Sequence, residues 1–280
     1  MKGESSGEDV RGKMVASLDR KEARLVDELK QYPSMLVAFS GGVDSSYLLV
    51  MAHKVLKNRV TAVTIQSPLH PQRELRFAAR FAAERNIAHS IIQNDEIVSE
   101  ELIANPRDRC YICKKLMIRD IRRVGRDMGI DHIAHGANVD DLNDYRPGMK
   151  AAREMNLIAP LLGAGLNKGE IRLLSQKLGL ETWDKPAMAC LATRIPYGTP
   201  IDSRSLGMIE SAEDVLFDMG IRACRVRHHG DMARIEVSPS EFEFIMSSEM
   251  RSRIIDRLRA VGYRFVTLDL EGYVQGSLNR

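Results

Sequence analysis

The sequence is poor in cysteine, in aromatic residues and in net charge. Four cysteines in 280 residues are too few for a disulfide scaffold and suit a reducing cytoplasm. Aromatic residues make up 5%, and the formal net charge is only +3, so a nucleic-acid partner is not expected. No apolar run approaches the roughly 20 residues that span a bilayer, and the first residues lack the apolar core of a secretory signal. We therefore expect a cytoplasmic protein that binds neither membranes nor nucleic acid.

The sequence does contain a regular alternation of short apolar runs and helical patterns. Strand-like runs occur at residues 34–39, 59–67, 88–93 and 131–137, with helical patterns at 18–32, 44–56, 72–86 and 111–129. This order predicts an α/β fold, a parallel sheet with helices on both faces. After about residue 200 the pattern changes to helices at 203–220 and 239–262 and strands within 223–237 and at 263–270. We predict a disordered tail over 1–12, an α/β domain over 13–200 and a smaller α+β domain over 201–280.

The turn after the first strand reads FSGGVDSSYLL, residues 39–49. Gly41 and Gly42 allow backbone amides to approach an anion, and the following helix adds its positive N-terminal dipole. Asp44 would repel a phosphate unless Mg²⁺ lies between them. Further hydroxyl groups come from Ser40, Ser45 and Ser46. Neither a Walker A sequence nor Gly-x-Gly-x-x-Gly is present. The alternative is a simple strand–helix turn with Asp44 as the helix cap.

Ser-Gly-Gly-Val-Asp-Ser resembles the PP-loop of the ATP pyrophosphatases. Those enzymes split ATP between the α and β phosphates, usually to adenylylate an oxygen that a nitrogen or sulfur nucleophile then displaces. The resemblance implies that ATP and Mg²⁺ bind to residues 40–46, Val43 included. Gly136, in the loop after the fourth strand, can let the backbone close over the nucleotide. Nearby acids can hold Mg²⁺ or cap the next helix, and an arginine can hold an anion or form a surface salt bridge: Asp140, Asp141, Asp144 and Arg146.

Three of the cysteines allow several readings. Cys110 and Cys113 lie in NPRDRCYICKK, and Cys190 lies in KPAMACLATRIPYGTP. Three thiolates can hold three irons of a 4Fe–4S cluster and leave the fourth iron for an exogenous sulfide. With a histidine they can form a zinc site, and they can also be three unrelated thiols. Cys224 lies in a strand pattern and is predicted to be a buried core thiol.

Five motifs occur in the order SGGVDSS, NPRDRCYICK, HGANVDDLNDYRPGMKAA, KPAMACLATRIPYG and RVRHHGDMARIEV, over residues 15–270. Together they resemble the LarE family, the ATP-dependent pyridinium-3,5-biscarboxylic acid mononucleotide sulfurtransferases of nickel-pincer cofactor biosynthesis. In that family ATP converts a carboxylate to its acyl-adenylate, and sulfur then displaces AMP. Some members sacrifice a cysteine equivalent to Cys190, and others use three cysteines and a 4Fe–4S cluster. The thiols at 110, 113 and 190 match the cluster-dependent type.

The same resemblance implies roles for charged residues. Arg194, four residues after Cys190, is expected to act in catalysis with Cys190 and Asp44. Arg225 and Arg227 lie two apart and therefore share a strand face, at positions that handle the substrate phosphate. A solvated strand face is the alternative. A divalent cation is implied at two acidic positions, Glu213 and Glu236.

The implied partners are a small nucleotide substrate, sulfide or another sulfur donor, and further copies of the chain in a homo-oligomer. Two rival readings share the PP-loop. A tRNA thiolase with a three-cysteine cluster would need a nucleic-acid surface. A synthetase such as the ATP pyrophosphatase half of GMP synthetase would leave the three cysteines without a role.

Overall fold

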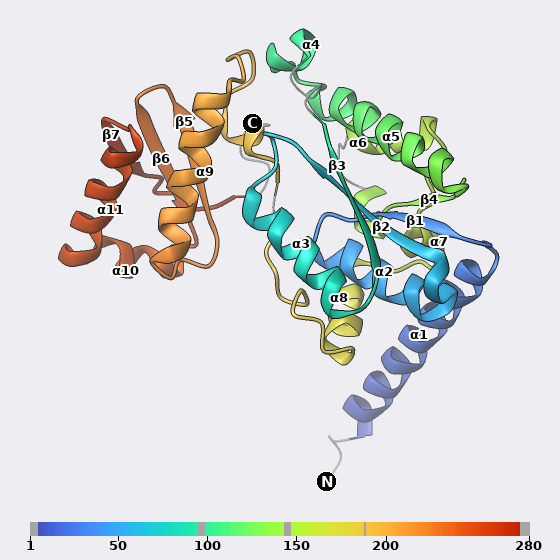
Figure 1. Ribbon diagram of the computed structural model, residues 1–280. Coiled ribbons are helices and arrows are strands. Elements are labelled where there is room, and N and C mark those ends of the chain that lie inside the picture. The colour runs from blue at the N-terminus through green and yellow to red at the C-terminus, as the bar shows by residue number, and fades with distance from the viewer. Residues whose placement is uncertain (1–4, 95–98, 143–146, 188, 275–280) are drawn as a thin grey trace. The chain divides into compact units, whose positions relative to one another are not determined.

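The computed structural model describes residues 5–94, 99–142, 147–187 and 189–274, with side chains from residue 15 onward. The chain forms two compact units that alternate along the sequence (Figure 1). The N-terminal unit comprises residues 1–66, 72–94 and 110–187, and the C-terminal unit comprises residues 67–71, 95–109 and 188–280. This division differs from the predicted boundary at residue 200. The Asn105 side chain explains part of the difference, because it donates to the carbonyls of Pro196 and Thr199 at 2.8 and 3.0 Å.

The N-terminal unit contains a four-stranded sheet in the order β3-β2-β1-β4. The strands are β1 (Met35–Ala38), β2 (Val60–Gln66), β3 (Ala88–Gln93) and β4 (Ile133–Ala134). All three pairings are parallel. Nearly every residue of β1 and β2 is buried, which explains why these strands read as continuous apolar runs. The predicted parallel α/β sheet is confirmed.

Helices cover both faces of this sheet. On one face, Met35 and Val37 of β1 join a core with Leu25 of α1 and Phe81 of α3. On the other face, Leu36 packs against α5, where a Cβ added at Gly125 would lie 3.3 Å from it. The helices of this unit are α1 (Ser5–Lys30), α2 (Val43–Leu56), α3 (Gln72–Glu84), α5 (Arg109–Met128), α6 (Pro147–Glu154), α7 (Pro160–Gly163) and α8 (Lys168–Lys177).

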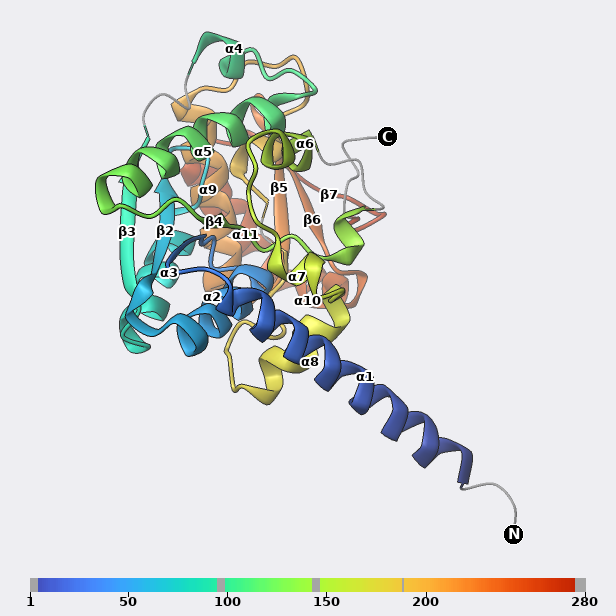
Figure 2. The ribbon, with the colours of Figure 1, turned by 90° about the vertical axis from the view of Figure 1, so that its right-hand side faces the viewer.

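The long helix α1 is prominent in Figure 2. It begins at Ser5, inside the segment 1–12 that the sequence predicts as a disordered tail. No proline interrupts residues 5–30, so the helical pattern of residues 18–32 can continue upstream.

The C-terminal unit packs helices on a three-stranded sheet in the order β5-β6-β7. Strands β5 and β6 are antiparallel, and β6 and β7 are parallel. Its elements are α4 (Glu100–Ile103), α9 (Ser203–Asp218), β5 (Cys224–His229), β6 (Met232–Val237), α10 (Phe242–Met246), α11 (Ser248–Val261) and β7 (Phe265–Leu268). The predicted helix over 239–262 is interrupted, because Ser247 has an extended conformation with φ −55° and ψ 144°. Within the described residues of both units, no helix is long and apolar enough to cross a membrane.

Candidate active site

The PP-loop joins β1 to α2 and is shaped by glycine. Gly41 has φ +72°, and a Cβ there would lie 2.9 Å from Cδ1 of Phe77. Gly42 is the N-cap of α2 and provides no side-chain cap bond. Uncapped backbone amides and the helix dipole therefore meet at the end of β1, an arrangement suited to a phosphate group.

The serines of the loop have two different environments. The hydroxyl of Ser45 donates to the Gly42 carbonyl at 3.2 Å and accepts from the Ser40 amide at 3.3 Å. The two hydroxyls of Ser40 and Ser45 are also 3.1 Å apart. Ser46 is fully buried, and its hydroxyl has no hydrogen-bond partner in the described part of the chain. Ser40 and Ser45 thus fix the shape of the loop.

Asp44 carries the main charge of this loop. Its Oδ2 accepts from Nζ of Lys168 at 2.6 Å. Its Oδ1 is buried and has no hydrogen-bond partner among the described residues. Burial raises the pKa of Asp44, Lys168 opposes this shift, and the charge of Asp141 adds to it. An orphaned carboxylate oxygen near a second acid fits a divalent cation such as Mg²⁺.

The loop after β4 approaches the first turn of α2 closely. A Cβ at Gly136 would lie 2.9 Å from the Ser45 amide nitrogen, so only glycine fits there without movement. Asp141 accepts from the Asn138 amide at 3.0 Å, and Asp140 accepts from the Lys168 amide at 2.8 Å. Asp140 therefore contacts the first residue of α8, which is not the helix that follows it in sequence. Asp144 and Arg146 lie outside the described residues.

Lys168 and Lys185 were not predicted as site residues. Nζ of Lys185 donates to the Gly41 carbonyl at 3.1 Å and to Glu74 at 2.7 Å. The same ammonium lies 3.6 Å from the centroid of the Phe77 ring. Lys185 therefore stabilises the PP-loop through the Gly41 carbonyl, although 144 residues separate the two in sequence.

The cysteines occupy both units. Cys110 is exposed and Cys113 is partly exposed, both within the first five residues of α5, and their spacing of three places them on one helix face. Cys190 is partly exposed and precedes the short helix Leu191–Arg194. Cys224 is 1% exposed, as predicted for a core thiol. In the part of the chain that the structure describes, no three His, Cys, Asp or Glu side chains form a group that could hold a metal ion.

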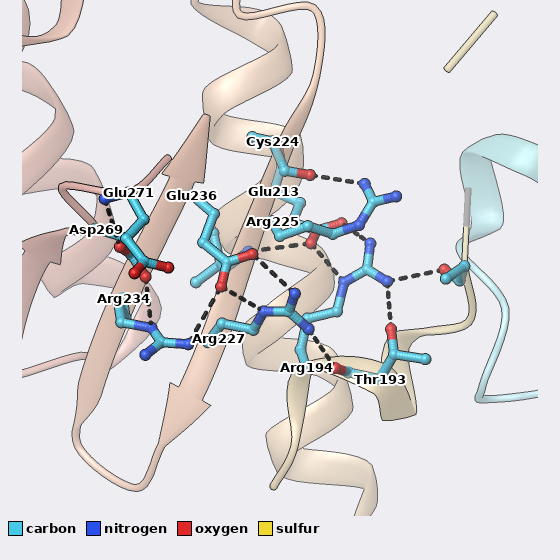
Figure 3. Close-up of polar contacts among 12 residues, drawn as sticks. Thr193, Arg194, Glu213, Cys224, Arg225, Arg227, Arg234, Glu236, Asp269 and Glu271 are labelled. Carbon is cyan, nitrogen blue, oxygen red and sulfur yellow. Dashed lines mark hydrogen bonds and ion pairs between the residues drawn. The ribbon is translucent and has the colours of Figure 1, made fainter. Parts of the chain in front are cut away.

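The turn at Cys190 is held by a buried arginine, Arg194, whose contacts with Glu213 and Thr193 are drawn in Figure 3. Arg194 is 0% exposed and pairs with Glu213 through two hydrogen bonds of 2.7 and 3.0 Å. It also donates to the carbonyls of Ala189 and Cys190 at 2.9 and 3.1 Å. The Thr193 hydroxyl donates to the Cys190 carbonyl at 2.7 Å. Arg194 was predicted to act in catalysis with Cys190, and in the structure its guanidinium bonds the backbone around Cys190 and Glu213.

A second pair lies on the β5–β6 sheet. Arg227 bonds Glu236 through two hydrogen bonds of 2.8 Å and donates to the Thr193 carbonyl at 2.6 Å. Arg225 donates to the Cys224 carbonyl at 2.8 Å, and burial and the charge of Arg194 lower its pKa.

Arg225 and Arg227 are 4% and 5% exposed, so the alternative of a solvated strand face is wrong. Glu213 and Glu236 each face an arginine. The sequence predicted a divalent cation at these two acids. Such a cation would have to displace the arginines that now pair with them.

The geometry of the PP-loop agrees with the comparison to known families. The profile of a PP-loop domain matches residues 14–142. A loop of this shape after the first strand of a parallel sheet, with this match, defines an ATP-binding PP-loop enzyme.

Relatives extend the match beyond that domain. The chain is 34% identical over 267 residues to pyridinium-3,5-bisthiocarboxylic acid mononucleotide synthase of Lactiplantibacillus plantarum, which covers 95% of this chain and 96% of the relative. It is 38% identical over 245 residues to an uncharacterized protein of Synechocystis sp., covering 88% and 91% of the two chains. Identity to tRNA-specific 2-thiouridylase of Rickettsia peacockii is 29% over 192 residues, which cover 55% of this chain and 52% of that one. The chain belongs to the LarE family and is an ATP-dependent sulfurtransferase.

Proposed function

We propose that the enzyme converts the carboxylates of pyridinium-3,5-biscarboxylic acid mononucleotide to thiocarboxylates, as a step of nickel-pincer cofactor biosynthesis. The observation that carries this proposal is the match to the synthase of L. plantarum along nearly the whole chain. That match includes the Cys190 turn and the arginine-rich strands of the C-terminal unit as well as the PP-loop.

Each conversion has two balanced steps. A substrate carboxylate oxygen attacks the α-phosphorus of ATP, the bond between the α-phosphorus and the bridging oxygen breaks, and pyrophosphate leaves. A sulfur nucleophile then attacks the acyl carbon, the bond to the AMP oxygen breaks, and AMP leaves with the electron pair. The amides of the PP-loop bind the phosphates, and Asp44 with Asp141 would hold Mg²⁺, which neutralises charge on the phosphates.

We further propose that sulfide is the incoming sulfur and that Cys110, Cys113 and Cys190 are ligands of a 4Fe–4S cluster. Three thiolates are an appropriate donor set for such a cluster, which would supply a site for sulfide. Contacts inside the C-terminal unit support the assignment. Arg109, the residue before Cys110, lies over the Tyr197 ring at 4.2 Å and donates to Asn105 at 2.6 Å. The segment leading to Cys110 is thereby joined to the segment that follows Cys190.

The test is to measure iron and acid-labile sulfide in anaerobically purified protein, together with intact mass before and after one turnover. About four irons and an unchanged mass support the cluster. No iron and a loss of about 34 Da, one H₂S, would make Cys190 a sacrificial donor left as dehydroalanine. A failure to form any thiocarboxylate with ATP, Mg²⁺, sulfide and the dicarboxylate would contradict the proposed reaction itself.

Variants sharpen this test. We expect C110A and C113A to lose iron and product formation, whereas C224A keeps both because Cys224 is a core thiol.

The partial similarity to the tRNA thiolase makes tRNA thiolation the second candidate. RNA that co-purifies with the protein and accepts sulfur would favour it.

A further inference from the structure

Lys168 forms an ion pair with Asp44 of the PP-loop. Its Nζ lies 2.6 Å from Oδ2 of Asp44, although 124 residues separate the two in sequence. The side chains of Lys168 and Asp44 are 35% and 19% exposed. The ion pair is therefore accessible from solvent and is not part of the core.

The backbone of Lys168 is fixed, whereas its side chain is long. Lys168 is the first residue of α8, and its amide donates to Asp140 at 2.8 Å. The residue before it, Asn167, forms a capping box with Glu170. Glu170 in turn binds Lys21 at 2.7 Å. Only the flexible four-carbon stem of Lys168 can move without breaking these contacts.

The charges around this ammonium are unequal. The charge of Asp141 acts on Asp44 in the first turn of α2, and Oδ1 of Asp44 has no hydrogen-bond partner in the described structure. A lysine supplies one positive charge to one oxygen. A divalent cation on Asp44 would repel that ammonium, and phosphates at the α2 N-terminus would attract it.

We propose that Lys168 is a further ATP-binding residue that exchanges Asp44 for the nucleotide phosphates when a divalent cation binds the carboxylate. In the absence of nucleotide, Lys168 neutralises Asp44 and keeps it oriented. In the complex, the ammonium contacts a phosphate oxygen. This role rests on the ATP-dependent reaction proposed above, because it concerns the same phosphate site.

The test compares K168M with the wild-type enzyme by titration calorimetry. K168M keeps the length of the side chain and removes its charge. We expect it to bind Mg·ATP about tenfold or more weakly, because a charge-assisted contact to phosphate is lost. Binding of Mg²⁺ alone is expected to stay equal or become tighter, because no ammonium competes for Asp44. K168R, which keeps the charge, should bind Mg·ATP within a few-fold of wild type.

Lys177 provides a matched control. It lies on the same helix, is 62% exposed and contacts Asp19 at 3.5 Å, so K177M should leave both affinities unchanged. Wild-type affinity of K168M for Mg·ATP would overturn the proposal. A parallel loss of Mg²⁺ and Mg·ATP binding would also overturn it, because Lys168 would then only orient Asp44. If the wild-type enzyme itself binds no Mg·ATP, the proposed function fails first, and this result is distinct from both.

Discussion

The PP-loop of the N-terminal unit and a cluster in the C-terminal unit both place charge in positions with little access to solvent. We call this cluster the arginine layer; it consists of Arg194, Arg225, Arg227, Glu213 and Glu236. At the PP-loop, Oδ1 of Asp44 and the Ser46 hydroxyl are buried without a partner among the described residues. In the arginine layer, Glu213 receives two bonds from Arg194 and one from the Val226 amide. Unsatisfied polar groups are costly, so they are retained where a ligand completes them. Satisfied ion pairs hold the backbone in place, and the Cys190 turn is what this layer holds.

The largest expected effect comes from Asp44. We expect D44N to lower the rate of pyrophosphate release by about a thousandfold, because the site loses the charge that would hold Mg²⁺ in the proposed reaction. Folding stability at neutral pH should be equal or higher. The pKa of Asp44 is raised in the folded state, so its ionised form is disfavoured there. Pyrophosphate release and thermal unfolding measure the two quantities.

Asp127 is the control for D44N, since it is exposed on α5 of the same unit. D127N should leave both quantities unchanged. A marked loss of stability in D44N would remove the contrast between the two regions, because Asp44 would then be a structural charge like Glu213.

Breaking the arginine layer should mainly lower folding stability, whereas D44N should mainly lower the reaction rate. We expect E213A to lower the free energy of unfolding by about 3–5 kcal/mol, because it leaves the buried Arg194 without its counter-charge. Urea unfolding checks this value. E249A is the control, since Glu249 is 83% exposed and pairs with Arg253 only at the surface. Its effect should stay below about 0.5 kcal/mol. Equal effects of the two variants would show that the layer does not stabilise the unit.

The glycine of the PP-loop allows a finer test. We expect G41A to cost about 1–3 kcal/mol from its left-handed backbone and to raise the KM for ATP, because the new methyl group would press on Phe77. G129A is the matched variant: Gly129 has φ +67°, but a Cβ there would meet nothing within 4 Å. It should share the loss of stability and keep the KM. An unchanged KM in G41A would contradict the role of the loop shape.

The smallest expected effect is a dependence of stability on pH. Burial and, to a smaller extent, the charge of Lys114 together lower the pKa of His135 to about 3. The unfolded chain therefore binds the proton first, and stability should fall as the pH drops below about 6.5. The slope should approach about 1.4 kcal/mol per pH unit for this one group. Urea unfolding between pH 7.5 and 5 measures the slope, and H135Q should make it shallower. Identical slopes would assign the effect elsewhere.

The sheet and the PP-loop could be predicted because their signals are local. An apolar run, two glycines and a helical pattern stand next to each other at residues 34–56, and the structure has β1, the loop and α2 there. The strands around His229 are equally local. No residue range was predicted for any element between residues 147 and 187, where α6 is eight residues long, α7 is one short turn and α8 is ten residues long.

The charged contacts could not be predicted in the same way. Lys168 and Lys185 meet the PP-loop from 124 and 144 residues away, and no pattern in the sequence announces a partner at that distance. The residue types at Arg194 and Glu213 were noticed, but their pairing depends on how α9 lies beside the Cys190 turn. The sequence therefore shows that charged residues occur near Cys190. Whether each charge contacts a ligand or another side chain depends on the packing of the folded chain.

The polypeptide passes between the two units after residues 66, 71, 94, 109 and 187. Neither unit is therefore encoded by one continuous stretch of the gene. During synthesis the N-terminal unit cannot close until residue 187 has left the ribosome. At that point the segments 67–71 and 95–109 have been synthesised, but residues 188–280, the rest of their unit, have not. A deletion of residues 188–280 would leave these two segments without the rest of their unit. The C-terminal unit is therefore not a module that can be removed by truncation.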